Sequence, residues 1–511
     1  DSIAVMVRLA AVVMSRALPV AAGVAVAGCA QIAGIHDTTG DARPGNSLAV
    51  SRMSIGAKIA TSALDLTGLS ATYFVTGSDG ATIDRVTADP EPAHLGVWTT
   101  KLRKPAPVQF TLPDVPAPFP RLFAFPSADL SVLYGVLEHP HPSPAPDGAT
   151  FTVTAPLDAA PAMGELFQTY VVGAWLARNF AAAELTLTGA ALTPPAFSFA
   201  PVNSVPGRPQ LDLVTEDDAF LILRYLGTAL TGVAEAAIAQ TGADTAVTTG
   251  MMAPVAADQT LDVTIAPLAL AGRYTAVRPE VATLAINWSL VAAPGYQIAA
   301  NAGPVLQSGA LTMTDVGLNV KYGNPFAMRG WNTVLTVATS ESRVYMPAGP
   351  GGLPTPITLF AGMNQFVAPP VPSPGIDMPA LLPVKILFGQ LYLDNDGLTV
   401  KQPTGFVDLT IQTELATDEA AQATTLYNLQ VFELVVNATA TALERRIVIA
   451  AAGSEPTFAL PPEVFQVGHS YTVRALVTHG GYPNVGDGNF LARDLPLAQS
   501  YLDSGVFTVM P

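Results

Sequence analysis

The 511-residue chain is poor in sulfur and in charge. Its single cysteine excludes a disulfide within the chain and a cysteine-based zinc site, because both need further sulfur atoms. Only 13% of the residues are charged, against about 25% in an average soluble protein. The 24 lysines and arginines face 40 aspartates and glutamates, so the formal net charge is −16. Such a surface repels phosphate backbones, and we expect no nucleic acid partner.

The sequence motifs of the common enzyme classes are also lacking. The chain has no Gly-x-Ser-x-Gly elbow, no His-Glu-x-x-His, no P-loop and no dinucleotide-binding glycine fingerprint. These absences lower the expectation of catalysis without excluding an enzyme. We predict no catalytic residue and no cofactor.

Apolar residues are abundant, at half of the chain, which is enough to build buried cores and argues against global disorder. At about 150 residues per domain, the length predicts roughly three domains. The 45 prolines and 42 glycines divide the chain into short segments but stay below the share typical of low-complexity sequences.

The N-terminal region has the pattern of a secretion signal. From Met14, where we expect translation to start, one arginine precedes the apolar run Ala17–Ala27. This run has the length of a signal-peptide core and is shorter than the roughly 20 apolar residues that span a bilayer. A longer helix from Ile3 would include Arg8 and Arg16, which makes a transmembrane helix the weaker alternative.

The cysteine directly follows Val26, Ala27 and Gly28, and this four-residue segment resembles the lipobox of bacterial lipoproteins. The resemblance implies cleavage before Cys29 and anchoring of the chain in a membrane by acyl groups on Cys29, which hold a protein durably when two or three are attached. Ala30 follows, and the absence of Asp there implies sorting to the outer membrane of a Gram-negative-type bacterium, facing the periplasm or the surface. The alternative is an ordinary buried cysteine beside a signal peptide without lipid.

From Leu48 onward, apolar and polar residues mostly alternate in short runs bounded by proline, glycine, asparagine and aspartate. A period of two is typical of strands with one face in a core. We therefore expect an all-β protein of several β-sandwich domains in series, of the immunoglobulin or fibronectin III kind, after a signal peptide and a flexible tether. The clearest alternating runs are Phe151–Thr154, Leu185–Thr188, Leu261–Ile265, Leu284–Trp288 and Val407–Ile411.

One segment leaves helix and strand open. Ala219–Tyr225 has the composition of a buried strand, whereas Leu226, Leu230 and Val233 share one face of a helix. Gly227 would interrupt that helix, and we predict a strand.

Proline-rich segments at 138–147 and 368–374 predict the domain boundaries. The chain is divided on this basis into a signal peptide at 1–28, a flexible tether at 29–47, a sandwich at 48–157, a β-rich middle block at 158–383 that forms one large or two small sandwiches, and a last domain at 384–511.

The segment Val467–Ala475 resembles the F strand of fibronectin type III domains, in which Gly-x-x-Tyr leads into Val-x-Ala. The resemblance implies a fibronectin type III-like fold for residues 384–511. It also implies that Tyr471 is the tyrosine-corner residue, whose hydroxyl bonds back to upstream backbone. The sequence departs from the family in lacking the tryptophan of the B strand.

Two motifs resemble metal sites without completing one. His139 and His141, with Glu138, would place two imidazoles and a carboxylate together, but the intervening prolines favour a solvated loop. Asp394–Gly397 begins like a calcium loop, yet Gly405 stands where an EF-hand needs an acid. We predict no metal site, and we interpret Asp394–Gly397 as a hairpin turn.

Acidic and aromatic residues are the remaining candidates for carbohydrate chemistry. Glu216–Asp218 is the densest acidic cluster, and we interpret it as a solvated turn rather than the carboxylate pair of a glycosidase. Trp175 and Trp288 lie in apolar or alternating runs and are expected in the core. Of the remaining two, Trp98 and Trp331, Trp331 is the better candidate for an exposed sugar-stacking platform.

These patterns together predict a lipid-anchored envelope protein with a β-sandwich ectodomain. Its expected role is non-enzymatic, in scaffolding, adhesion or a surface assembly, with an envelope protein or a glycan as partner. The alternative is an extracytoplasmic protein that binds or degrades polysaccharide.

Overall fold

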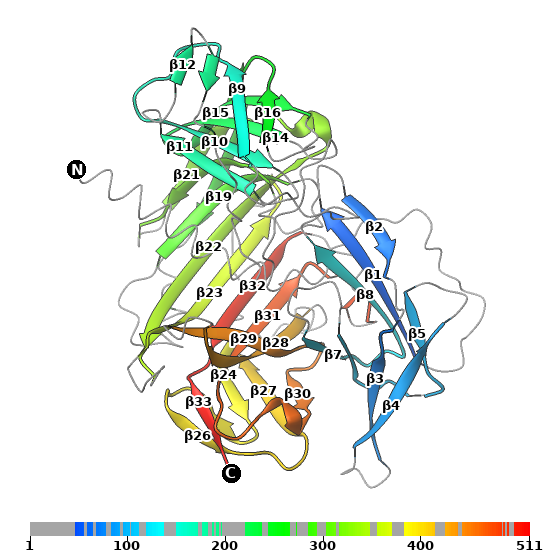
Figure 1. Ribbon diagram of the computed structural model, residues 1–511. Helices are drawn as coiled ribbons and strands as arrows, with labels where there is room; N and C mark the ends of the chain where they lie inside the picture. Colours follow the sequence, from blue (N-terminus) through cyan, green and yellow to red (C-terminus); the bar gives the residue numbers. More distant parts are fainter. Residues whose placement is uncertain are drawn as a thin grey trace.

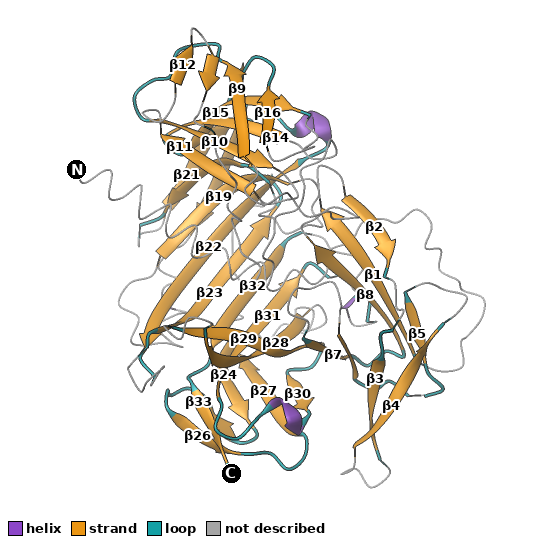
Figure 2. Cartoon of the chain, in the orientation of Figure 1, coloured by secondary structure: helices purple, strands orange, loops and turns teal. Residues whose placement is uncertain are grey.

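The computed structural model consists almost entirely of β-strands, with only short helical turns (Figure 2). The all-β prediction is confirmed, and strands cover each of the five alternating runs wholly or in part. The structure describes residues 46–55, 59–64, 68–77, 83–91, 96–102, 104–111, 119–136, 150–171, 176–181, 186–188, 191–193, 196, 220–237, 244–265, 272, 285–293, 303–312, 316–347, 355–369, 383–413, 425–437, 442–482, 484–485, 488–489 and 495–511.

The first unit surrounds a core in which Trp98 and Phe123 flank the ring of Phe110. Its first strand is paired on both sides, in parallel with the eighth and antiparallel with the second and fifth. The strands are β1 (Ser47–Ile55), β2 (Ile59–Ala63), β3 (Ala71–Thr76), β4 (Ile83–Pro90), β5 (Val97–Thr99), β6 (Val108–Thr111), β7 (Pro120–Ala124) and β8 (Asp129–Val136).

The second unit is a sandwich whose two sheets enclose Phe151, Phe167 and Phe220. Phe220 opens β14, so the segment left open between helix and strand is a strand, as predicted. The strands are β9 (Thr150–Pro156), β10 (Glu165–Val171), β11 (Leu176–Ala181), β12 (Thr186–Thr188), β13 (Ala191–Thr193), β14 (Phe220–Leu226), β15 (Ala229–Ala236), β16 (Asp244–Thr248) and β17 (Ala253–Pro254).

The third unit extends the sheet of β14 and β15 and packs a two-stranded sheet, β18 with β21, against it. Its core contains Trp288, which is therefore buried as predicted. The elements are β18 (Gln259–Ile265), β19 (Ala285–Ala293), β20 (Val305–Ala310), β21 (Val316–Tyr322), a 3-10 turn (Ala327–Arg329), β22 (Asn332–Tyr345) and β23 (Ile357–Val367).

The last unit is a sandwich of a four-stranded sheet against the strands around β28 and β31. The Tyr471 hydroxyl accepts a hydrogen bond of 2.8 Å from the backbone N–H of Gln466, which is the upstream bond expected of it. The elements are β24 (Pro383–Phe388), β25 (Leu391–Tyr392), β26 (Leu398–Lys401), β27 (Val407–Thr413), β28 (Thr425–Val436), β29 (Leu443–Gly453), β30 (Thr457–Leu460), a 3-10 turn (Pro462–Val464), β31 (Ser470–Gly480), β32 (Leu497–Asp503) and β33 (Phe507–Met510).

Strand pairing does not stop at the edge of any unit. β23 of the third unit pairs with β32 of the last, along Ala361–Phe366 and Leu497–Leu502. β7 of the first unit pairs in parallel with β29 of the last, along Arg121–Ala124 and Ala450–Gly453. Figure 1 shows β22, β23, β32 and β31 side by side in one sheet. Backbone hydrogen bonds therefore connect the units.

The unbroken series of paired strands begins at β11 and ends at β8. Its order is β11, β10, β14, β15, β20, β19, β22, β23, β32, β31, β28, β29, β7, β6, β3, β4, β5, β1 and β8. The domain boundaries expected near residues 157 and 383 remain predictions. Two of the pairings, β23 with β32 and β7 with β29, link segments on opposite sides of them.

Gly362 tests the joint between β23 and β32. A Cβ on Gly362 would lie far inside van der Waals contact with the buried ring of Tyr501, its cross-strand partner. We expect Gly362→Ala to lower the free energy of unfolding by about 1–3 kcal/mol, the usual cost of overpacking. Gly405→Ala is the control, because nothing lies within 4 Å of its added Cβ. Equal urea midpoints for the two variants would contradict the close approach.

Candidate functional site

Several candidate residues lie outside the described part of the chain, namely Cys29, Glu138, His139, His141, Trp175 and Glu216–Asp218. Their roles stay predictions. Within the residues that the structure does describe, no group of three His, Cys, Asp or Glu side chains could hold a metal ion.

The turn at Asp394–Gly397 is present, but it does not close the expected hairpin. The Leu393 N–H bonds to the Ile386 carbonyl in one sheet, whereas β26, after the turn, pairs with β33 in the other. The turn therefore carries the chain from one sheet to the other. Asp396 forms an ion pair with Arg343, which occupies its carboxylate with a guanidinium.

Trp331, the better candidate for an exposed sugar-stacking platform, is buried. Its side chain is only 3% exposed and stacks on Phe326, with 5.2 Å between ring centroids. Asn324 binds the adjacent backbone, because its Nδ2 donates to the Trp331 carbonyl. The local turn thus folds the indole inward, and Trp98, at 0% exposure, is also buried. Among the described residues, tryptophan supplies no exposed sugar-stacking surface.

Asp503, the most deeply buried charged residue among those described, forms a cluster with Arg474 and Arg445, called here the central ion cluster. The Asp503 carboxylate accepts bonds from Arg474 Nε at 2.6 Å and from a terminal nitrogen of Arg474 at 2.9 Å. Arg445 donates to the same carboxylate at 2.9 Å, as does the backbone N–H of Phe360 at 2.8 Å. The cluster therefore ties β23 to β29, β31 and β32, at the crossing of two units.

Aromatic rings enclose the two arginines of the central ion cluster. Each guanidinium carbon lies 5.7 Å from the Phe432 ring centroid and 6.0 Å from that of Phe360. Burial alone would raise the pKa of Asp503, but attraction by Arg474 and Arg445 and the hydrogen bonds lower it to about 2. Asp503 therefore remains ionised at neutral pH.

Strand register places Asp503 at one end of a row of side chains that crosses five strands on one sheet face. The row runs from β7 through β29, β28 and β31 to β32, and directly opposed residues share a face. Its members are Arg121, Ala450, Gln430, Arg474 and Asp503. The neighbouring row has Phe123, Ala452, Asn428, Leu476 and Tyr501.

Both rows have alanine on β29, between larger side chains on β7 and β28. The small side chains leave a shallow depression that we call the β7–β28 hollow, with a cavity volume of about 30 Å³. The larger side chains that line it are Phe119, Arg121, Phe123, Asn428 and Gln430, and the small ones are Ala450 and Ala452.

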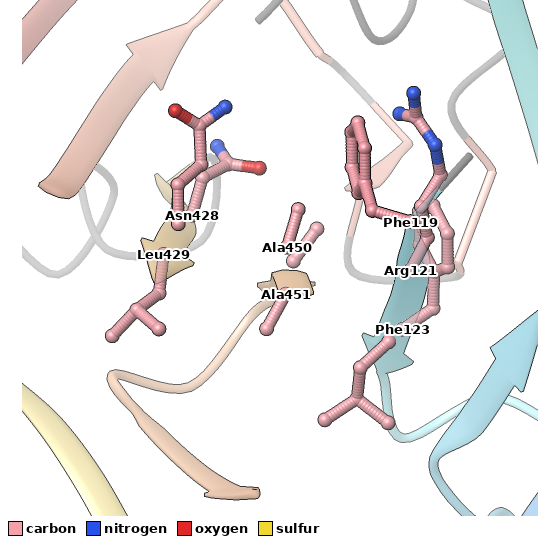
Figure 3. Close-up of a pocket in the computed structure, with 10 residues that line it drawn as sticks. Phe119, Arg121, Phe123, Asn428, Leu429, Ala450 and Ala451 are labelled. Carbon is pink, nitrogen blue, oxygen red and sulfur yellow. The ribbon is translucent and has the colours of Figure 1, made fainter. Parts of the chain in front are cut away.

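Figure 3 shows the guanidinium of Arg121 and the side chains of Phe119 and Asn428 on one side of the strands. Leu429 and Ala451 point the other way, and both belong to the core of the last sandwich. The Arg121 guanidinium lies 4.6 Å from the Phe119 ring centroid. The hollow is thus bordered by a stacked cation, the ring of Phe119 and carboxamides, whereas Phe123 packs in the core of the first unit.

The sequence carries only part of the signal for this hollow. Asn428 and Gln430 alternate with Leu429 and Val431 in an otherwise apolar strand, which marks a second, polar face. Arg121 stands between Phe119 and Phe123 in the same way. The pairing of β7 with β29 brings the two patterns together, and no local pattern predicts that pairing.

Comparison with known proteins adds little. No family model matches the chain, and no curated protein matches it. Among solved structures, the chain has a weak similarity to E. coli alpha-2-macroglobulin in its native conformation, with a TM-score of 0.11 and 10% sequence identity. The similarity covers 89% of this chain but only 28% of that chain, and at this TM-score it carries no argument.

Asp503→Asn tests the central ion cluster. The substitution keeps the shape of the side chain but leaves the buried guanidinium of Arg474 and the partly buried one of Arg445 without their counter-ion. We expect a loss of about 3–5 kcal/mol in the free energy of unfolding, measured in urea. Asp408→Asn, on the exposed side of β27, is the control and should stay within about 0.5 kcal/mol. A similar small loss for both variants would show that the cluster is not needed.

The pH dependence of stability gives a second test of the same carboxyl. Its pKa is lowered from 3.8 to about 2 on folding, so its contribution is full above pH 3.8 and is lost as the pH falls through 2. This contribution is about 2 kcal/mol. The difference in unfolding free energy between wild type and Asp503→Asn should therefore shrink from pH 4 to pH 2. A constant difference over this range would contradict the lowered pKa.

Proposed function

We propose that the chain is a lipid-anchored envelope protein with a non-enzymatic role as a scaffold, an adhesin or a subunit of a surface assembly. The observation that carries the proposal is the unbroken pairing of strands from β11 to β8. An ectodomain built this way holds its surfaces at fixed distances, as a structural role requires. The membrane anchor rests on the sequence around Cys29, and so does the placement at the outer membrane.

The described charged groups support a structural role. Asp503 and Asp396 are ion-paired with arginines from neighbouring strands, and Glu165 is ion-paired with Arg224. A carboxylate held ionised by guanidinium groups, as Asp503 is, is poorly suited to act as a general acid.

None of the helices found among the described residues has the length and apolarity needed to cross a membrane.

Polysaccharide binding is the second candidate, and the aromatic and carboxamide groups that border the β7–β28 hollow are the observation that favours it. Aromatic faces and carboxamides are the groups that contact the apolar and hydroxylated sides of a sugar. The hollow favours binding over degradation, because the described residues that line it include no carboxylate.

Cys29→Ser tests the anchor in the native host. Wild-type protein should fractionate with the outer membrane, and its mature mass should exceed that of residues 29–511 by the added acyl groups. The substitution should remove both the added mass and the membrane association. Ala30→Asp is the matched variant, because it keeps the acylated residue and, by the resemblance, should move the protein to the inner membrane. An unmodified wild-type cysteine on soluble protein would overturn the proposal.

A further inference from the structure

We propose that Lys101 and Lys104, which follow β5, contact anionic lipid headgroups beside the membrane anchor. The inference rests on the proposed anchor at Cys29, and it names a second contact between the chain and the membrane. Three observations carry it: the cations of this segment, the hydrogen bonds that hold the segment at the end of the tether, and the length of the tether.

Basic residues are scarce in this chain, yet three of them follow β5 within four positions. The 511 residues include only 24 lysines and arginines, and the three are Lys101, Arg103 and Lys104. Lys101 and Lys104 are exposed, and neither forms an ion pair with a described residue. Their ammonium groups can therefore meet an anion on a surface that approaches this end of the first unit.

Two acids lie at the same end of the sheet, but they do not cancel the cations. Strand register sets Asp89 opposite Thr99 and Asp129 opposite Ser47. The Asp129 carboxylate accepts a hydrogen bond of 2.5 Å from the Ser47 hydroxyl. The three basic residues still outnumber the two acids, whereas the chain as a whole has a net charge of −16. An anionic surface that repels most of the chain is therefore tolerated best at this end.

Hydrogen bonds hold the two lysines beside the residue that leads into β1. The Asn46 carbonyl accepts a bond of 2.9 Å from the backbone N–H of Thr100, directly before Lys101. The Asn46 side chain donates through Nδ2 to the Lys104 carbonyl at 2.7 Å. Asn46 is only 1% exposed, so both bonds are shielded from water. The chain between Cys29 and β1 therefore arrives at the very segment that carries the lysines.

The length of the tether keeps these lysines close to the bilayer that holds the anchor. Residues 29–45 form a segment of 17 residues. A flexible chain of this length has a root-mean-square end-to-end distance of about 23 Å. Basic residues next to a lipid anchor add to its membrane affinity, and each one near an anionic surface strengthens binding about fivefold. The tether thus supplies the proximity, and the lysines supply the attraction.

Fluorescence quenching of the anchored, full-length protein in vesicles tests the inference. Acylation blocks the thiol of Cys29, so a dye attaches only to the cysteine of Pro105→Cys, an exposed position beside Lys104. The vesicles are phosphatidylcholine with or without phosphatidylglycerol, and both kinds contain a lipid with a quencher on its headgroup. We expect stronger quenching with phosphatidylglycerol, by about fivefold in the ratio of docked to undocked protein for each lysine in contact. High salt should remove the difference by screening.

Lys101→Gln combined with Lys104→Gln should lower quenching with phosphatidylglycerol to the level seen without it. The matched control is Lys321→Gln combined with Lys401→Gln, which removes the same charge from exposed positions on β21 and β26 and should change nothing. Thermal midpoints show whether each variant folds.

The outcomes separate this inference from the proposed anchor. Equal quenching in the two kinds of vesicle, or an equal loss in both pairs of variants, would overturn the lysine contact and leave the anchor intact. A wild-type protein without acyl groups on Cys29 would instead overturn the proposed anchor, on which this contact rests.

Discussion

Backbone hydrogen bonding between segments far apart in the sequence is the constraint on which this structure depends. A strand at the edge of a sheet exposes unpaired N–H and carbonyl groups, which are costly to bury and prone to pair with other chains. Here β23 and β32 satisfy one another's edges, and so do β7 and β29. Each of these sandwiches would otherwise have an unpaired edge strand, and the two pairings join them into one series of strands. The relative position of the units then follows from strand register.

Such a joint brings polar and charged side chains to places that would be apolar in a separate sandwich. Asp503 and Arg474 are almost fully buried where β23 joins the last unit. A buried ion pair of this kind gives little net stability over an apolar pair, but it is costly to break. The single hydrogen bond from the Phe360 backbone N–H to Asp503 favours one alignment of β23 over others. The cluster therefore contributes more to the uniqueness of the joint than to the gross stability of the fold.

Local patterns predicted much of this structure, because they follow from physics within a few residues. Alternation predicted strands such as Leu261–Ile265 and Val407–Ile411, and the Tyr471 hydroxyl bond followed from a short motif. Pairings between distant strands leave no local trace, so the joints and the β7–β28 hollow could not be predicted. One interpretation was wrong, and one candidate was not borne out. The Asp394–Gly397 turn changes sheets, and Trp331 is buried by packing on Phe326, a tertiary contact that its exposed-looking sequence context hides.

Hydrogen–deuterium exchange of the intact ectodomain, followed by mass spectrometry, tests most directly whether the units form one hydrogen-bonded body. The informative peptides are those covering β7 and β29, since their pairing joins the first unit to the last. We expect the amides of β7 to be protected as strongly as those of β28, which is paired on both sides. Exchange of the β7 amides within seconds, beside a protected β28, would contradict a continuous series of strands and leave separate sandwiches on linkers.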